Sequence, residues 1–129
     1  MSNSGLSLID ANVKCSCKGN NLDKLLQPSI LTLLANRDMH GYVIIQELEN
    51  KNLFQCEKYD NAGIYRTLKS LEEKALVSSE WEFDATGPAK KIYKINSSGK
   101  ECLANWIRTL EDYKKTIDVI IKSAKAVIE

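Results

Sequence analysis

Apolar residues recur at steps of three and four along most of the chain, a spacing typical of helices with one buried face. The first such runs predict helices over about residues 21–35 and 40–50. Pro28 lies inside the first run, so that helix either begins there, with proline in its first turn, or kinks there. A third helix follows Asp60, a favourable N-cap residue. The face that this third helix should bury consists of Ile64, Leu68, Leu71 and Ala75.

Two β-rich runs follow, Val77–Phe83 and Lys91–Ile95, and Gly87–Pro88 predicts a turn between them. Alternation of apolar and polar residues predicts a two-stranded ribbon with one face covered by the core. The predicted fold class is therefore mainly α with a small β-hairpin (α+β). The order helix, helix, hairpin is typical of a winged helix-turn-helix, in which one helix enters a DNA major groove and the hairpin lies beside it.

A long final helix is predicted over about residues 98–127. Its apolar positions alternate steps of three and four, which makes an a/d heptad seam. These positions are Leu103, Trp106, Leu110, Tyr113, Ile117, Ile120, Ala124 and Val127. A domain of this size cannot cover so long a stripe, so we expect a homodimer joined through this helix. The predicted organisation is a flexible arm over 1–20, a DNA-binding domain over 21–97 and a dimerisation helix over 98–129.

The charge balance is close to neutral, with 18 basic and 17 acidic residues. Many DNA-binding domains are strongly basic, so any DNA contact has to come from a local concentration of charge. The exposed face of the third helix and the return strand of the hairpin offer such groups. The predicted DNA-binding residues are Asn61, Tyr65, Arg66, Lys69, Ser70, Lys90 and Lys91. The third helix itself is nearly neutral, because two glutamates, Glu72 and Glu73, offset its cations.

Catalytic and cofactor motifs are missing from the sequence. His40 is the one histidine, and no glycine-rich phosphate loop is present, so we expect neither an enzyme nor a cofactor. The N-terminus resembles no signal peptide and no apolar run approaches the roughly 20 residues that span a bilayer, which predicts a cytoplasmic protein without membrane contact.

Four cysteines, Cys15, Cys17, Cys56 and Cys102, should then be reduced, and Cys102 lies beside an apolar stripe. The Cys15/Cys17 spacing is shorter than that of a zinc knuckle, which favours two free thiols and no metal site. A metal or redox role for this pair is the alternative.

Several short segments together resemble the PadR family of transcriptional regulators. They are His40-Gly41-Tyr42, Ala62-Gly63-Ile64-Tyr65, Leu68-x-x-Leu71-Glu72, Leu76-Val77, Lys91-Ile92-Tyr93-Lys94-Ile95 and Gly99. The resemblance implies a winged helix-turn-helix that dimerises through its C-terminal helix and usually represses transcription. It places Tyr65 on the recognition-helix tyrosine of the family, and Lys90 and Lys91 on its basic wing.

The single C-terminal helix resembles the shorter branch of this family, in which some members bind flat apolar or aromatic compounds at the dimer interface. The residues that would line such an effector pocket, or simply pack the interface, are Leu103, Trp106, Leu110, Tyr113 and Ile117. The chain departs from the family pattern at Gly63, Arg66, Ala75 and Asn96. Of these, Ala75 replaces a glycine that is the preferred C-cap.

The predicted function is a sequence-specific DNA-binding repressor released by a small aromatic or apolar effector. The alternatives are a winged-helix module for protein–protein contact and a metal- or redox-sensing regulator.

Overall fold

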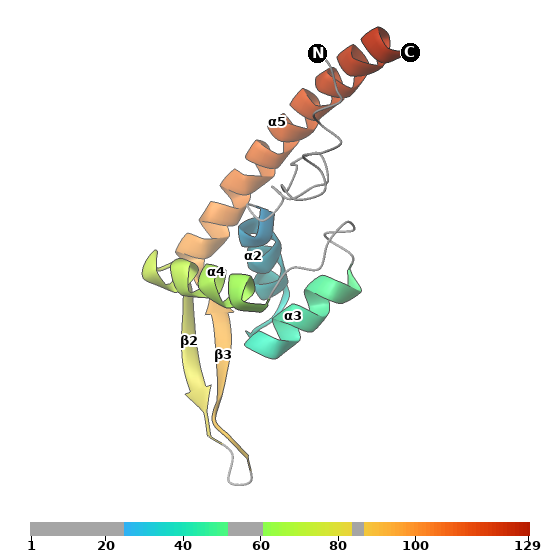
Figure 1. The fold of residues 1–129 in the computed structure, drawn as a ribbon. Coiled ribbons are helices and arrows are strands. Elements are labelled where there is room, and N and C mark those ends of the chain that lie inside the picture. The colour runs from blue at the N-terminus through green and yellow to red at the C-terminus, as the bar shows by residue number, and fades with distance from the viewer. Residues whose placement is uncertain (1–24, 52–60, 84–86) are drawn as a thin grey trace.

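The computed structural model describes residues 25–51, 61–83 and 87–129. Within these ranges the chain forms four helices and a three-stranded antiparallel sheet (Figure 1). The helices are α2 (Leu26–Asn36), α3 (Gly41–Asn50), α4 (Asn61–Glu73) and α5 (Ser97–Ile128). The strands are β1 (Met39–His40), β2 (Val77–Glu82) and β3 (Lys90–Ile95). This arrangement confirms the predicted α+β fold class. The β2–β3 hairpin is called the wing below.

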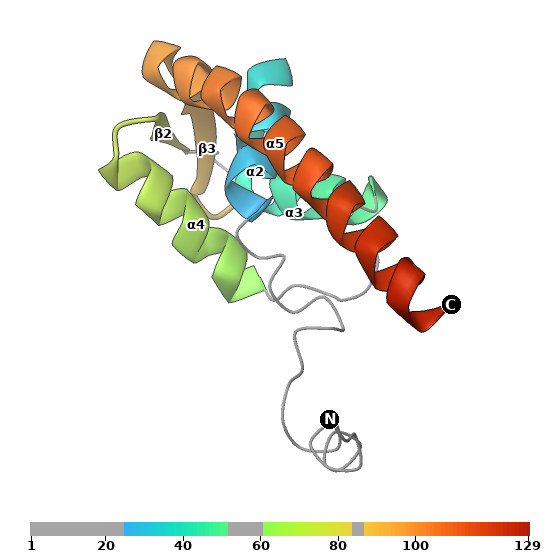
Figure 2. The ribbon, with the colours of Figure 1, turned by 90° about the horizontal axis from the view of Figure 1, so that it is seen from above.

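Helix α2 is the centre of the core. It packs against α3, α4, α5 and β3, and Figure 2 shows it between α4 and α5. Ile30, Leu31 and Leu34 on this helix are almost completely buried. Pro28 stands in the first turn, where its missing N–H leaves no helical hydrogen bond unmade, so the helix begins near the proline and does not kink there.

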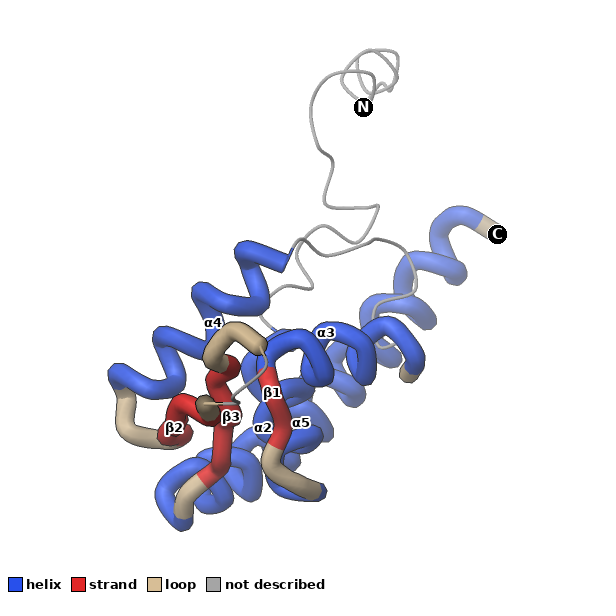
Figure 3. The backbone as a smooth tube through the Cα atoms, turned by 90° about the horizontal axis from the view of Figure 1, so that it is seen from below, coloured by secondary structure: helices blue, strands red, loops and turns tan. Residues whose placement is uncertain are grey.

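The sheet has one strand more than the sequence predicts. Strand β1 pairs with β3, with Met39 opposite Tyr93, and β3 lies in the middle of the order β1-β3-β2 (Figure 3). Met39 is thereby buried in the core. A strand of two residues is too short to show any alternation, which is why the periodicity of the sequence does not reveal it.

The wing is covered by the core only at its base. Val77 and Tyr93 are buried there, whereas Trp81 is 57% exposed and Phe83 is 81% exposed. The prediction that one whole face is covered is therefore wrong for the outer half. Figure 1 shows that the hairpin extends away from the helical core.

Ala75 does not lie on the buried face of α4, as predicted, because the helix ends at Glu73. It is exposed and has a φ of 59°, in the left-handed region that favours glycine. The Leu76 N–H donates to the Leu71 carbonyl and the Ala75 N–H donates to the Glu72 carbonyl. These two bonds are those of a Schellman motif, formed here without the usual glycine.

Helix α5 is fixed to the body by its first turns. Asn96 caps the helix by accepting from the Gly99 N–H (2.8 Å), and its own amide donates to the Ala75 carbonyl (2.8 Å). The Trp106 indole N–H donates to Gln27 Oε1 on α2 (3.2 Å). Cys102 is half-buried and packs against the core. Beyond Leu110 every residue of the helix is exposed, and Figure 1 shows this part extending away from the body.

Some predictions fall outside the described residues: the arm over 1–20 with Cys15 and Cys17, the N-cap Asp60, and Cys56. Tyr42, placed by its spacing on the apolar face of α3, is 47% exposed instead. It stacks on His40, with ring centroids 5.6 Å apart. In the described part of the chain, no helix combines the length and the hydrophobicity needed to cross a bilayer.

Candidate nucleic-acid interface

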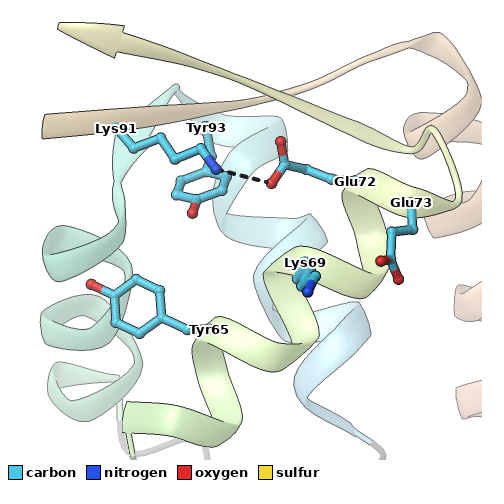
Figure 4. Close-up of a pocket in the computed structure, with 6 residues that line it drawn as sticks. All are labelled: Tyr65, Lys69, Glu72, Glu73, Lys91 and Tyr93. Carbon is cyan, nitrogen blue, oxygen red and sulfur yellow. Dashed lines mark ion pairs between the residues drawn. The ribbon is translucent and has the colours of Figure 1, made fainter.

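An open pocket separates the exposed side of α4 from the wing (Figure 4). Its α4 wall consists of residues at three- and four-residue steps, which therefore share one stripe of the helix. Its wing wall comes from the central strand β3. The lining residues are Tyr65, Lys69, Glu72, Glu73, Lys91 and Tyr93. Helix α4 and the wing thus present their polar side chains to one common space.

Tyr65 reaches from α4 to the start of α3. A Cβ atom added to Gly41 would lie 2.7 Å from Tyr65 Cε1, so the ring lies close against the backbone at this helix start and would have to shift for a larger residue. The tyrosine is nevertheless 44% exposed. Tyr65 therefore helps to hold α3 against α4 and keeps part of its ring accessible to a ligand.

The cations of α4 are free to meet a ligand. Arg66 and Lys69 are exposed, and neither has an ion-pair partner among the described residues. Asn61 is exposed at the first position of the helix, and Ser70 is half-buried. Two unpaired positive charges on a polar helix surface fit the backbone of a nucleic acid.

Lys91, by contrast, is held within the protein. Its ammonium lies 3.5 Å from Glu72 Oε1 on α4. It also lies over the rings of Trp81 and Tyr93, at 5.6 and 5.7 Å from their centroids. The other oxygen of the same carboxylate, Glu72 Oε2, accepts from the Ser79 hydroxyl on β2. A single carboxylate on α4 therefore contacts both strands of the wing.

A second set of contacts joins β1 and α3 to the same two strands. His40 Nε2 donates to Glu82 Oε1 at 2.8 Å. The Lys90 ammonium lies 5.5 Å from the centroid of the Tyr42 ring, which in turn stacks on His40. Lys90 has no ion-pair partner in the described part of the chain, so its charge remains available beside that of α4.

The phenol of Tyr93 forms the floor between these groups. Burial raises the pKa of the Tyr93 hydroxyl above its ordinary value of 10.0, and the nearby Glu72 carboxylate and Tyr65 raise it further. Tyr93 is therefore an uncharged phenol at neutral pH and serves as a packing surface for Lys91.

The structure places three of the seven predicted DNA-contacting residues in the lining of this pocket. Tyr65, Lys69 and Lys91 line it. Sequence reasoning treated Glu72 only as a charge that offsets the cations of its own helix and missed its pairing with Lys91. Contacts between a helix and a strand distant in the sequence leave no periodic signal, so no spacing rule would have found this pair.

The fold and this interface define a winged-helix protein. The sequence profile of the transcriptional regulator PadR-like family matches residues 30–105, so the chain belongs to that family. This confirms the resemblance and makes the protein a transcriptional regulator rather than an enzyme. The described residues contain no cluster of three His, Cys, Asp or Glu side chains that could hold a metal ion.

Three relatives illustrate the similarity. An uncharacterized protein of Lysinibacillus sphaericus is 30% identical over 75% of this chain and 88% of its own length. The negative transcriptional regulator PadR of Bacillus subtilis is 27% identical over 73% of this chain, but the match spans only 51% of the longer relative.

The crystal structure of that Bacillus subtilis PadR with operator DNA superposes with a TM-score of 0.57 at 29% identity, over 64% of this chain and 47% of the other. A transcriptional regulator structure from Thermoplasma acidophilum superposes with a TM-score of 0.68 at 28% identity. The match covers 78% of this chain and 94% of the other. The winged-helix body therefore has close counterparts among solved transcriptional regulators.

Proposed function

We propose that this protein is a homodimeric, sequence-specific DNA-binding repressor, with α4 as recognition helix and the wing beside it. Membership of a transcriptional regulator family and the likeness to a regulator solved with operator DNA support this function. Binding to chromosomal DNA would place the protein in the cytoplasm. The predicted contacts are made by Asn61, Tyr65, Arg66, Lys69, Ser70, Lys90 and Lys91.

The observation that carries the proposal is the set of unpaired cations on α4 and on the wing. Arg66 and Lys69 extend from α4 without an ion pair, and Lys90 adds a third available charge from the wing. Phosphate contacts from such groups position a protein on DNA, while the same helix reads base edges. A nearly neutral chain can bind DNA in this way because these three cations have no ion-pair partner among the described residues.

The exposed apolar face of α5 supports a homodimer. Tyr113 and Ile117 are about half exposed in the single chain. Pairing of this face with a second copy would place two recognition helices in successive major grooves, so the operator should be a near-palindrome with half-sites about one turn apart. A flat apolar or aromatic effector would fit between the paired helices, beside Leu103, Trp106 and Leu110, and release the DNA.

Salt-dependent binding to a DNA fragment from upstream of the protein's own gene tests the proposal. The double variant Arg66→Ala/Lys69→Ala should weaken operator binding by at least about 100-fold and flatten the salt slope by about one for each lost phosphate contact. Lys115→Ala/Lys122→Ala is the matched control, because it removes the same charge from exposed positions of α5 opposite the heptad seam.

Equal loss in both double variants would show that total charge, and not the α4 surface, drives binding. Binding that is absent from this fragment and from neighbouring promoters would overturn the DNA-binding proposal and leave the protein–protein module as the better description. A purified protein assayed for metal, with and without Cys15→Ser/Cys17→Ser, tests the sensing alternative separately.

A further inference from the structure

We propose that Glu72 is the positioning residue that sets how well this protein distinguishes its operator from other DNA. The inference rests on the proposed function. It assigns a role to a residue that is not among the predicted DNA contacts. Glu72 sits in the last turn of α4, and its two carboxylate oxygens contact Lys91 on β3 and Ser79 on β2. One side chain therefore fixes the recognition helix relative to both strands of the wing.

The ion pair with Glu72 also means that Lys91 is not a free cation. The ammonium is paired with Glu72 and lies over Trp81 and Tyr93, so its charge is compensated before any DNA arrives. A phosphate can recruit Lys91 only by displacing the carboxylate. Lys91 therefore contributes less to sequence-independent attraction than the unpaired cations Arg66 and Lys69.

Specificity depends on this restraint for two reasons. Sequence-independent affinity comes almost entirely from cations that meet phosphates, so each additional free lysine strengthens binding to every DNA equally. Base readout needs a fixed geometry between the helix in the groove and the wing on the backbone. The Glu72 carboxylate lowers the number of free cations by pairing with Lys91. It also fixes the geometry between α4 and the wing. Both effects raise the ratio of specific to non-specific binding.

The neighbouring residue provides a matched control. Glu73 lines the same pocket, carries the same charge and is exposed, but among the described residues it holds neither a lysine nor a strand. Glu72→Gln and Glu73→Gln therefore make the same change of charge at nearly the same place. Only Glu72→Gln releases Lys91.

The first measurement needs no DNA. Hydrogen exchange of the wing amides should accelerate several-fold in Glu72→Gln and stay at the wild-type rate in Glu73→Gln. Ser79→Ala, which keeps the lysine pair but loses the bond to β2, should show a smaller acceleration. Equal exchange rates in wild type and Glu72→Gln would overturn the positioning role, whatever the protein does with DNA.

The second measurement compares an operator duplex with a scrambled duplex of the same composition. Glu72→Gln should bind the scrambled duplex at least about tenfold more tightly, with a salt slope steeper by about two per dimer, and lose about tenfold in the operator-to-scrambled ratio. Glu73→Gln should leave that ratio at the wild-type value. Adding Lys91→Gln to Glu72→Gln should return scrambled binding to the wild-type level, because the gain arises from the released lysine.

The outcomes separate the two proposals. A wild-type protein that shows no salt-dependent preference for any duplex refutes the proposed function, and the role of Glu72 in specificity is refuted with it. A wild type that discriminates its operator, with equal ratios in Glu72→Gln and Glu73→Gln, refutes the specificity role alone.

Discussion

The two ends of α5 have the same pattern of apolar residues and opposite surroundings. Near the start of the helix, Leu103 and Trp106 pack against the core, whereas Tyr113, Ile117 and Ile120 farther along are 50–59% exposed. The difference follows from what lies opposite. Helix α2 has 11 residues and α5 has 32, so at about 1.5 Å per residue the shorter helix covers only the first third of the longer one. Periodicity identifies the apolar face of a helix, but the length of its neighbour decides how much of that face is buried.

The largest expected effect comes from a charge on the exposed seam. Ile117→Lys would place one uncompensated charge from each chain in the apolar seam of the proposed dimer, which should dissociate it to monomers and weaken operator binding at least about 100-fold. The melting temperature of the winged-helix body should change little, because Ile117 is 52% exposed and lies beyond the part of α5 that packs on the core. Light scattering and operator titration give the two readouts.

Val119→Lys is the control for that prediction. Val119 is 63% exposed and falls outside the a/d seam, so its substitution should leave the dimer intact. An Ile117→Lys variant that stays dimeric would mean that this face does not make the interface. Monomers in both variants would mean that added charge on α5, and not the a/d position, dissociates the dimer.

A substitution at the start of α5 should instead lower the stability of the fold. A Cβ atom at Gly99 would lie 2.2 Å from the Leu76 carbonyl oxygen and 2.6 Å from Ile95 Cγ1. Gly99→Ala should therefore lower the free energy of unfolding by about 2–3 kcal/mol, measured by urea denaturation. Gly87→Ala, with nothing within 4 Å of the added atom, should stay within about 0.5 kcal/mol of wild type. A tolerated Gly99→Ala would show that α5 is less firmly seated than its contacts indicate.

A smaller effect is expected where α5 meets α2. Trp106→Phe removes the indole donor to Gln27 and leaves most of the ring in place, so it should cost about 1 kcal/mol of unfolding free energy. Trp81→Phe is the matched change on the outer wing, where the ring is 57% exposed, and it should cost less. If Trp81→Phe proved the more damaging of the two, the wing rather than α5 would be the region fixed to the core.

The smallest change should be stabilising. Ala75→Gly relieves the left-handed backbone at the end of α4 and keeps the carbonyl that accepts from Asn96. The gain should be about 0.5–1 kcal/mol, since removal of the strain exceeds the greater chain entropy of glycine. Ala62→Gly, in the first turn of α4, should instead cost up to about 1 kcal/mol. A loss of stability in both variants would contradict the strain at Ala75.

Much of the fold could be predicted because most elements leave a periodic signal. Ile64, Leu68 and Leu71 are buried as their spacing indicates, and α3 and α5 begin and end within one residue of the predicted bounds. The predictions fail where an element is too short to show a period, or where the sequence does not tell what packs against its apolar face. Strand β1 has two residues, and the outer wing alternates without a core beneath it.

The candidate interface was less predictable than the fold. Residue type was enough to select Arg66 and Lys69 as candidates, because a cation on the exposed face of a helix can be identified without knowing what lies near it. The ion pair between Glu72 and Lys91 depends on how a helix and a strand meet in space. A sequence records that both residues are present, but not that one neutralises the other.

The junction at Asn96 gives α5 the properties of a lever. Asn96 caps α5 and bonds to the carbonyl that follows α4, so the two helices are fixed to each other at one point. The part of the helix beyond Leu110 has 18 residues and is about 27 Å long, and a bend of about 7° where it leaves the body moves its far end by about 3 Å. That distance is close to one base-pair step of about 3.4 Å. In the proposed dimer, a ligand that altered the angle between the two arms by a few degrees would therefore move the proposed recognition helices out of register with the operator.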